Sequence, residues 1–170
     1  MQKPQSGEYN PYFQNYIKLV TEGDFQQLLQ QNTEALTQFF NSIPIEKREF
    51  RYAADKWTIK QLMIHIIDAE RVMSYRALTA ARGDDKSLLP SMDDQLFVQN
   101  ANISQKTLSN LITEFGTVRA ATEKFFENIS EEQSLFRANV VNVPTTVRAL
   151  GYIIIGHTLH HMNILKERYL

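Results

Sequence analysis

The chain has 170 residues, of which 43% are hydrophobic and 22% charged, and its formal net charge is −1. This length predicts one domain, residues 1–170, which can bury about two-thirds of the surface of the unfolded chain. The sequence shows no Lys/Arg cluster, no cysteine, no secretory leader and no run of about 18 apolar residues. These features argue against a nucleic-acid-binding protein, a membrane protein and a disulfide-rich protein. They predict a cytoplasmic protein.

The first elements along the chain are an arm and a helix. Residues 1–20 begin rich in Pro, Gly and Gln and then become aromatic, so we expect an extended arm or short helix on the domain surface. A long helix is predicted over residues 25–41, with Asp24 as its N-cap and Pro44 ending it. Its apolar residues recur at the spacing of one helix face, and Asn32 lies in the middle of that face.

A second long helix is predicted from Thr58 to about Arg82, where Gly83 ends it. Thr58 and Gln61 have the spacing of a capping box at its start. The residues expected to face inward are Leu62, His65, Ala69, Val72, Met73 and Arg76.

The next segment, residues 83–103, shows little periodicity and is long for a connection between helices. Extended, it would span about 60 Å, whereas the second helix is about 37 Å long. It can therefore return along the whole bundle and leave the second and third long helices parallel. The third helix is predicted from Ser104 to about Asn128, with Arg119 within its apolar face.

The C-terminal part is predicted to hold a short helical turn at residues 130–133, then an irregular segment to Pro144 that could form a second crossover. No alternation typical of strands is evident. The last helix is predicted from Thr145 or Thr146 almost to the end of the chain. Four long amphipathic helices with long connections predict an all-α fold, a four-helix bundle with long crossovers.

Three of the four histidines, His157, His160 and His161, lie in this last helix. His157 and His161 are four residues apart, so they project from one helix face. His65 lies on the inward face of the second helix. If the two helices meet at this height, three imidazoles converge on one point, as in catalytic zinc sites that keep a fourth position open. Nickel and ferrous iron accept the same ligands.

A structural explanation of these histidines stays open. A histidine on an apolar helix face is commonly a core residue with hydrogen-bonded ring nitrogens. The HxxxH spacing is also frequent by chance, and here it lacks the glutamate of HExxH metalloproteases. Two histidines within an apolar face nevertheless have four ring nitrogens to satisfy away from water. The spacing alone therefore leaves both a metal site and a histidine-containing core open.

Three segments resemble one known family. Residues 56–70, KWTIKQLMIHIIDAE, resemble the W-[ST]-x-x-[EQ]-x-x-x-H-[LI]-x-D-x-E segment of DinB-like (YfiT-like) proteins. Residues 75–84 are similar to the continuation of that helix in one branch of the family, and residues 156–161, GHTLHH, are similar to its C-terminal histidine motif. The resemblance covers residues 9–170, with the two histidine motifs about ninety residues apart.

The resemblance implies a four-helix bundle of unusual connectivity in which His65, His157 and His161 hold a divalent metal ion. It implies a metal-dependent enzyme acting on a small-molecule substrate: a hydrolase or, slightly favoured on family grounds, a transferase with a low-molecular-weight thiol cosubstrate. Such proteins often form homodimers. In one departure, Thr158 stands where many members carry an acidic residue, so another residue must serve any orienting or acid/base role. The alternative is a non-enzymatic dimeric bundle for binding or stress response, with structural histidines or metal.

Five further residues are candidates for the surroundings of the site. His160 points about 100° away from His161 on the helix, so we expect a neighbouring or surface group rather than a ligand. Arg76 and Arg119 are candidates for holding an anionic cosubstrate at the bundle mouth, although arginine stems also lie along apolar faces. Asn32 is a candidate for the cavity wall, or else a structural amide. Asp68 is a candidate for orienting a ligating histidine, or else a solvent-facing carboxylate.

Overall fold

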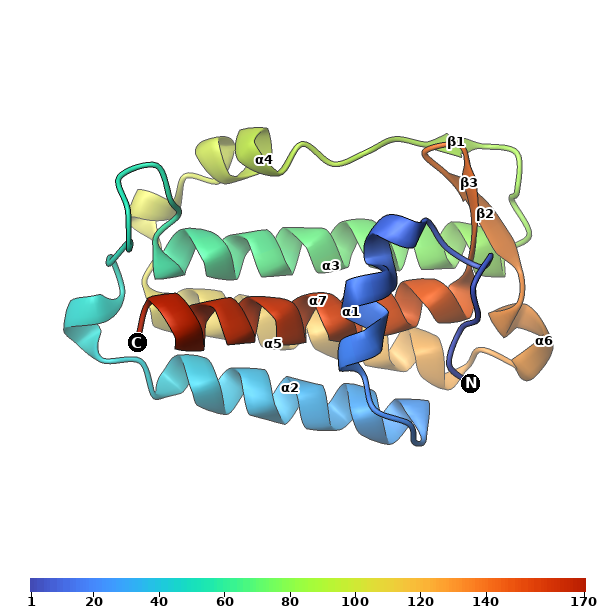
Figure 1. The fold of residues 1–170 in the computed structure, drawn as a ribbon, viewed down its shortest axis with the longest axis horizontal. Coiled ribbons are helices and arrows are strands. Elements are labelled where there is room, and N and C mark those ends of the chain that lie inside the picture. The colour runs from blue at the N-terminus through green and yellow to red at the C-terminus, as the bar shows by residue number, and fades with distance from the viewer.

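The computed structural model describes residues 1–170 and is dominated by four long helices. They are α2 (Phe25–Asn41), α3 (Ile59–Ala81), α5 (Leu108–Glu127) and α7 (Val147–Arg168). Figure 1 shows these helices lying side by side as a bundle. The shorter helices are η1 (Pro11–Phe13), α1 (Gln14–Leu19), η2 (Ile45–Lys47), α4 (Asp94–Asn100), η3 (Ile103–Gln105) and α6 (Glu131–Ser134).

Capping side chains set where three of the long helices begin. Asp24, Thr58 and Thr146 each accept a hydrogen bond from the backbone N–H three residues further on. The Thr58–Gln61 capping box is complete, with hydrogen bonds in both directions. The predicted bounds of α2, α3 and α7 are therefore confirmed to within about two residues.

The predicted start of the third long helix is wrong. Ser104 lies within the 3₁₀ helix η3, and the next residue after that helix, Lys106, is extended. Helix α5 begins instead after Thr107, which forms a capping box with Asn110. An Asn at the position usually held by Glu or Gln made this second cap less evident than the first.

Connectivity follows the prediction that the second and third long helices are parallel. Helices α3 and α5 run in one direction and α2 and α7 in the other (Figure 1). Helix α3 packs against α5 and α7, and α2 packs against the same two helices. The segment between α3 and α5 returns along the outside of α3 and carries α4 on the way (Figure 1). None of the helices has the length and apolarity that crossing a membrane would require.

A small three-stranded sheet closes one end of the bundle, although no strands were predicted. Strands β2 (Arg137–Val140) and β3 (Val143–Thr146) form an antiparallel hairpin, and β1 (Leu88–Leu89) pairs in parallel with β2. The expected irregular second crossover is thus a hairpin. Its turn residues Val141 and Asn142 both have positive φ, 50° and 62°. A Val-Asn turn lacks the glycine that makes such hairpins recognisable, and strands this short show little alternation.

The N-terminal arm forms the short helix that was among the predictions, and its inward residues belong to the core. Helix α1 crosses α7 (Figure 1), and Ile17 and Val20 are buried there. The crossing needs Gly156, because a Cβ at that position would lie 2.2 Å from the carbonyl oxygen of Tyr16. The arm is also fastened by a buried ion pair between Glu8 and Arg148.

Polar residues divide the interior into two apolar clusters of 19 and 16 buried residues. One cluster surrounds the arm and the first half of α7, and the other surrounds the second half of α7. Between them every long helix contributes polar side chains to what we term the central polar layer: Asn32 (α2), His65 and Glu70 (α3), Arg119 (α5), and His157, Thr158 and His161 (α7). A bundle of this size could fill that layer with apolar residues, so its polarity calls for an explanation.

Candidate metal centre

Three histidines of the central polar layer converge on one point. His65 comes from α3, and His157 and His161 come from successive turns of α7. The Nε2 atoms of His65 and His161 each lie 3.0 Å from Nε2 of His157. One nitrogen from each ring lies within 4.8 Å of the other two. The helices therefore meet at the height at which the sequence placed these three side chains.

Hydrogen bonding among the rings leaves this cluster poorly satisfied. A neutral imidazole has one N–H and one lone pair. Whichever Nε2 atom carries a proton, the buried Nδ1 atoms of His65 and His161 have no hydrogen-bond partner. A divalent cation among the Nε2 atoms would supply the attraction that the cluster lacks. Three neutral imidazoles are a donor set that fits zinc, nickel or ferrous iron.

Burial keeps these imidazoles in the neutral form. It lowers the pKa values of His157 and His161 well below the ordinary 6.5, and the neighbouring histidines lower them further. Burial also lowers the pKa of His65, against the opposing charges of Asp94 and Asp68. Neutral imidazole is the form that binds metal ions, so the electrostatics suit the same role as the geometry.

Three residues that were not among the site candidates surround the cluster. The ring of Trp57 lies 4.9 Å from that of His65, centroid to centroid, and the ring of Tyr16 lies 5.6 Å from that of His157. A carboxylate oxygen of Asp94 lies 3.9 Å from Nδ1 of His65. Tyr16 and Asp94 come from the arm and from the crossover after α3, and nothing local in the sequence marked either one.

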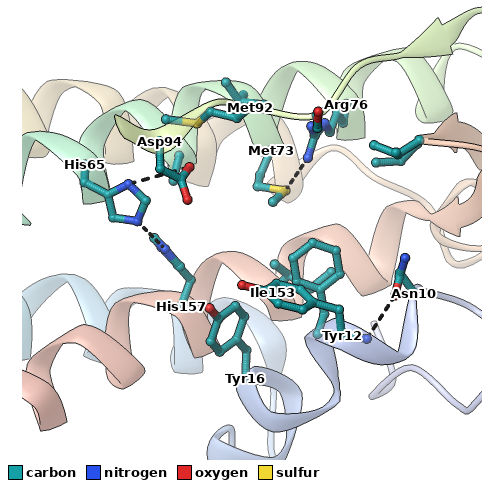
Figure 2. Close-up of a pocket in the computed structure, with 16 residues that line it drawn as sticks. Asn10, Tyr12, Tyr16, His65, Met73, Arg76, Met92, Asp94, Ile153 and His157 are labelled. Carbon is teal, nitrogen blue, oxygen red and sulfur yellow. Dashed lines mark hydrogen bonds and ion pairs between the residues drawn. The ribbon is translucent and has the colours of Figure 1, made fainter. Parts of the chain in front are cut away.

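The cluster forms one end of a cavity of about 300 Å³. Figure 2 shows His65 and His157 at this end and Arg76 further along α3. The arm, the crossover after α3 and the β2–β3 turn complete the wall, which is mostly hydrophobic. His161 does not line the cavity, and its ring packs against those of His65 and His157. The open side of the cluster therefore faces the cavity.

Arg119 and Asn32 lie in the interior rather than at a bundle mouth. The side chain of Arg119 is 0% exposed and donates to both carboxylate oxygens of Glu70, at 2.8 Å each. It also donates to Oδ1 of Asn32 at 2.8 Å and to Oγ1 of Thr158 at 3.4 Å. This arginine was one of two candidates for holding an anionic cosubstrate, but its counterion is Glu70 of the same chain, which the sequence did not reveal as its partner.

The other three candidates have different surroundings. Asp68 accepts a hydrogen bond from Arg71, one helical turn away, and touches none of the three histidines. His160 packs against Tyr16, with ring centroids 5.0 Å apart, and its nitrogens are not among the converging atoms. Arg76 lines the cavity, as its position three turns after His65 suggested.

A four-helix bundle with three histidines meeting at a cavity defines the class: a helical-bundle protein with a candidate metal centre. The family model of the DinB superfamily matches residues 28–165, so the chain belongs to the DinB superfamily, as the two sequence motifs indicated. The fold is similar to that of YfiT from Bacillus subtilis, described as a probable metal-dependent hydrolase with an unusual four-helix bundle topology. The alignment covers 97% of this chain and 90% of YfiT, with a TM-score of 0.75 and 13% identity. No curated protein gives a significant sequence match.

Proposed function

We propose that this protein is a divalent-metal-dependent enzyme that acts on a small molecule in the cavity beside His65 and His157. The observation that carries the proposal is the convergence of three neutral imidazoles at the cavity wall, with His65 and His161 buried and His157 partly exposed. The similarity in fold to YfiT, a probable metal-dependent hydrolase, supports the same class of reaction.

The proposed ligands are His65, His157 and His161. A divalent ion bound there supplies Lewis acidity and lowers the pKa of a nucleophile, either water in a hydrolase or a small thiol in a transferase. The side chains that could hold the ion number three, and no fourth protein group joins them. Three protein ligands beside a cavity favour an exchangeable position over a closed structural site, and so favour the enzyme over the non-enzymatic bundle.

Asp94 is our candidate for the proton acceptor. It is the one carboxylate on the cavity wall, and it lies beside His65 at the end where the reaction would occur. Its carboxylate also favours a proton on Nδ1 of His65, which leaves the lone pair of Nε2 directed into the cluster. Asp94 would then hold the proton that the nucleophile gives up, while the apolar wall limits access of bulk water.

Metal content of the untagged protein tests the ligand assignment. Elemental analysis should find about one equivalent of a divalent metal in the natural protein and in His160→Ala, and none in His65→Ala or His161→Ala. His160→Ala is the matched control because it removes a neighbouring imidazole that does not point into the cluster. One equivalent of metal retained by His161→Ala would contradict the assignment.

Cobalt substitution tests whether a small thiol reaches an open position on the ion, as the thiol-dependent transferase requires. With an open position, adding 2-mercaptoethanol to the cobalt-loaded protein should produce a thiolate-to-cobalt charge-transfer band in the near ultraviolet. An unchanged spectrum would show that small thiols do not reach the ion, and would leave water as the proposed nucleophile. The homodimer stays a prediction, and sedimentation velocity of the natural protein tests it.

A further inference from the structure

Arg76 is a buried cation without an anionic partner. It is 4% exposed, yet none of the ion pairs of the protein includes it. The two other buried arginines, Arg119 and Arg148, are each paired with a buried glutamate. Burial lowers the pKa of Arg76, and no neighbouring charge opposes that shift. An unpaired buried charge is costly, which leaves the position of Arg76 unexplained by the protein alone.

Two contacts hold the guanidinium of Arg76 at the cavity. One terminal nitrogen donates to the carbonyl oxygen of Pro90 at 2.6 Å, and the other lies 3.4 Å from the sulfur of Met73. A guanidinium has five N–H donors, so these contacts leave donors available. The Pro90 carbonyl fixes the orientation of the planar group, and a fixed guanidinium suits bidentate binding of a carboxylate or phosphate.

The cavity has opposite chemistry at its two ends. Asp94 and the histidines lie at one end and Arg76 at the other, with apolar side chains such as Met92 and Ile153 between them (Figure 2). His65 and Arg76 are eleven residues apart on α3, about 16 Å along the helix axis at 1.5 Å per residue. Side chains on a helix lean toward its N-terminus, so the guanidinium extends toward His65 and shortens this gap.

We propose that Arg76 determines substrate specificity by binding the anionic group, a carboxylate or a phosphate, of a small molecule whose apolar body lies along α3 toward His65. The inference deepens the proposed function. It depends on that function in one respect, namely that the end of the substrate near His65 is the end that reacts. The volume of about 300 Å³ limits the substrate to a small molecule, at the lower end of the usual range for ligand sites.

A purely structural role is the competing explanation, because the bond to Pro90 also fastens the crossover to α3. The two roles differ in what they predict for ligands. A structural arginine affects stability without discriminating between anionic and neutral ligands, whereas a binding arginine makes that discrimination itself.

The test compares 4-phenylbutyrate and 2-phenylethyl phosphate with the neutral 4-phenylbutanamide, by calorimetric titration of the full-length protein. Both anions should bind at least about tenfold more tightly than the amide, since a charge-assisted hydrogen bond is stronger than a neutral one. Arg76→Gln should abolish this preference and Arg76→Lys should retain part of it. Arg82→Gln, at the exposed arginine that caps the C-terminus of the same helix outside the cavity, should leave the preference intact.

Each titration is run on the protein as purified and after treatment with EDTA. The effect of Arg76→Gln should be present in both, so the result stays readable even if the proposed metal site fails. Equal affinity for 4-phenylbutyrate and its amide overturns the proposal, as does an anion preference that survives in Arg76→Gln. A preference that disappears with EDTA while Arg76 is intact assigns the anion to a metal ion instead, and also overturns it.

Discussion

The central polar layer holds two clusters of side chains that differ in how their polar groups are satisfied. In the first, Arg119 is paired with Glu70 and bonded to Asn32 and Thr158, which leaves only the amide nitrogen of Asn32 without a partner. In the second, Nε2 of His157 lies 3.0 Å from Nε2 of both His65 and His161 but can form only one hydrogen bond, so at least one of these contacts has no proton in it. Both clusters lie at the same height of the bundle, and only the second borders the cavity.

This difference distinguishes buried polar groups that stabilise the fold from buried polar groups that are available to a ligand. Buried polar groups are nearly always hydrogen-bonded, so a satisfied cluster is explained by the fold that contains it. An unsatisfied cluster beside a cavity calls for a partner from outside the chain. The same reasoning distinguishes Arg76, which lacks an anion, from Arg119 and Arg148, which have one.

Breaking the satisfied cluster should have the largest effect on stability. Arg119→Met leaves the carboxylate of Glu70 buried without its partner, so we expect a loss of about 3–5 kcal/mol in the free energy of unfolding. Urea denaturation followed by circular dichroism measures it. The double variant Arg119→Met/Glu70→Met should lose clearly less than the single variant. A loss below about 1 kcal/mol in the single variant would contradict the structural role.

Adding a cation should stabilise the unsatisfied cluster. Zinc at about a hundred times its dissociation constant should raise the free energy of unfolding by about 2.7 kcal/mol. For a chain of this length that corresponds to about 5–10 °C in the melting temperature. The shift should vanish in His65→Ala and persist in His160→Ala. Trp57, the single tryptophan, provides a second readout, because nickel or cobalt bound near His65 should quench its fluorescence.

The close contact between Gly156 and Tyr16 links the arm to the histidine cluster of the central polar layer. Gly156→Ala places a methyl group against the backbone of Tyr16, which should displace α1 and cost about 1–3 kcal/mol. We expect metal affinity to fall in this variant because Tyr16 covers His157. Gly116→Ala is the matched control: it points into open space within α5 and should stabilise the protein by up to about 1 kcal/mol. Unchanged stability and metal affinity in Gly156→Ala would contradict this prediction and show that the arm moves aside without cost.

The smallest effect is expected from the satisfied ion pair of the arm. Burial raises the pKa of the Glu8 carboxyl, but hydrogen bonds from Arg148, the N–H of Gln5 and Thr146 outweigh it, so the pKa lies below its ordinary value of 4.5. A depressed pKa in the folded state means that the carboxylate stabilises the protein above about pH 4.5 and that this contribution is lost as the pH falls through the folded-state pKa.

Replacing this carboxyl should therefore remove one source of acid sensitivity. Glu8→Gln should be less stable than the natural protein at neutral pH, and the difference should narrow as the pH falls below about 4.5. A difference between Glu8→Gln and the natural protein that stays constant with pH would mean that the pair contributes packing rather than charge.

Much of the fold could be predicted because its signals are local. Asp24, Thr58 and Thr146 cap their helices through backbone groups three residues away, so a few neighbouring residues suffice to place each start. Where the local signal was ambiguous, as between Ser104 and Thr107, the prediction failed. The β2–β3 hairpin was missed for the same kind of reason, since its turn contains no glycine.

The candidate site likewise has a part that the local sequence predicts and a part that it does not. Helical spacing alone put His157 and His161 on one face and His65 on the inward face of another helix, and the length of the crossover allowed α3 and α5 to be parallel. Which groups meet across the bundle depends on packing between distant segments. Only the tertiary structure could therefore pair Arg119 with Glu70, bring Asp94 and Tyr16 to the histidines, and leave Arg76 buried without an anion. The spacing of residues along a helix fixes the direction of each side chain but not the partner that the side chain meets.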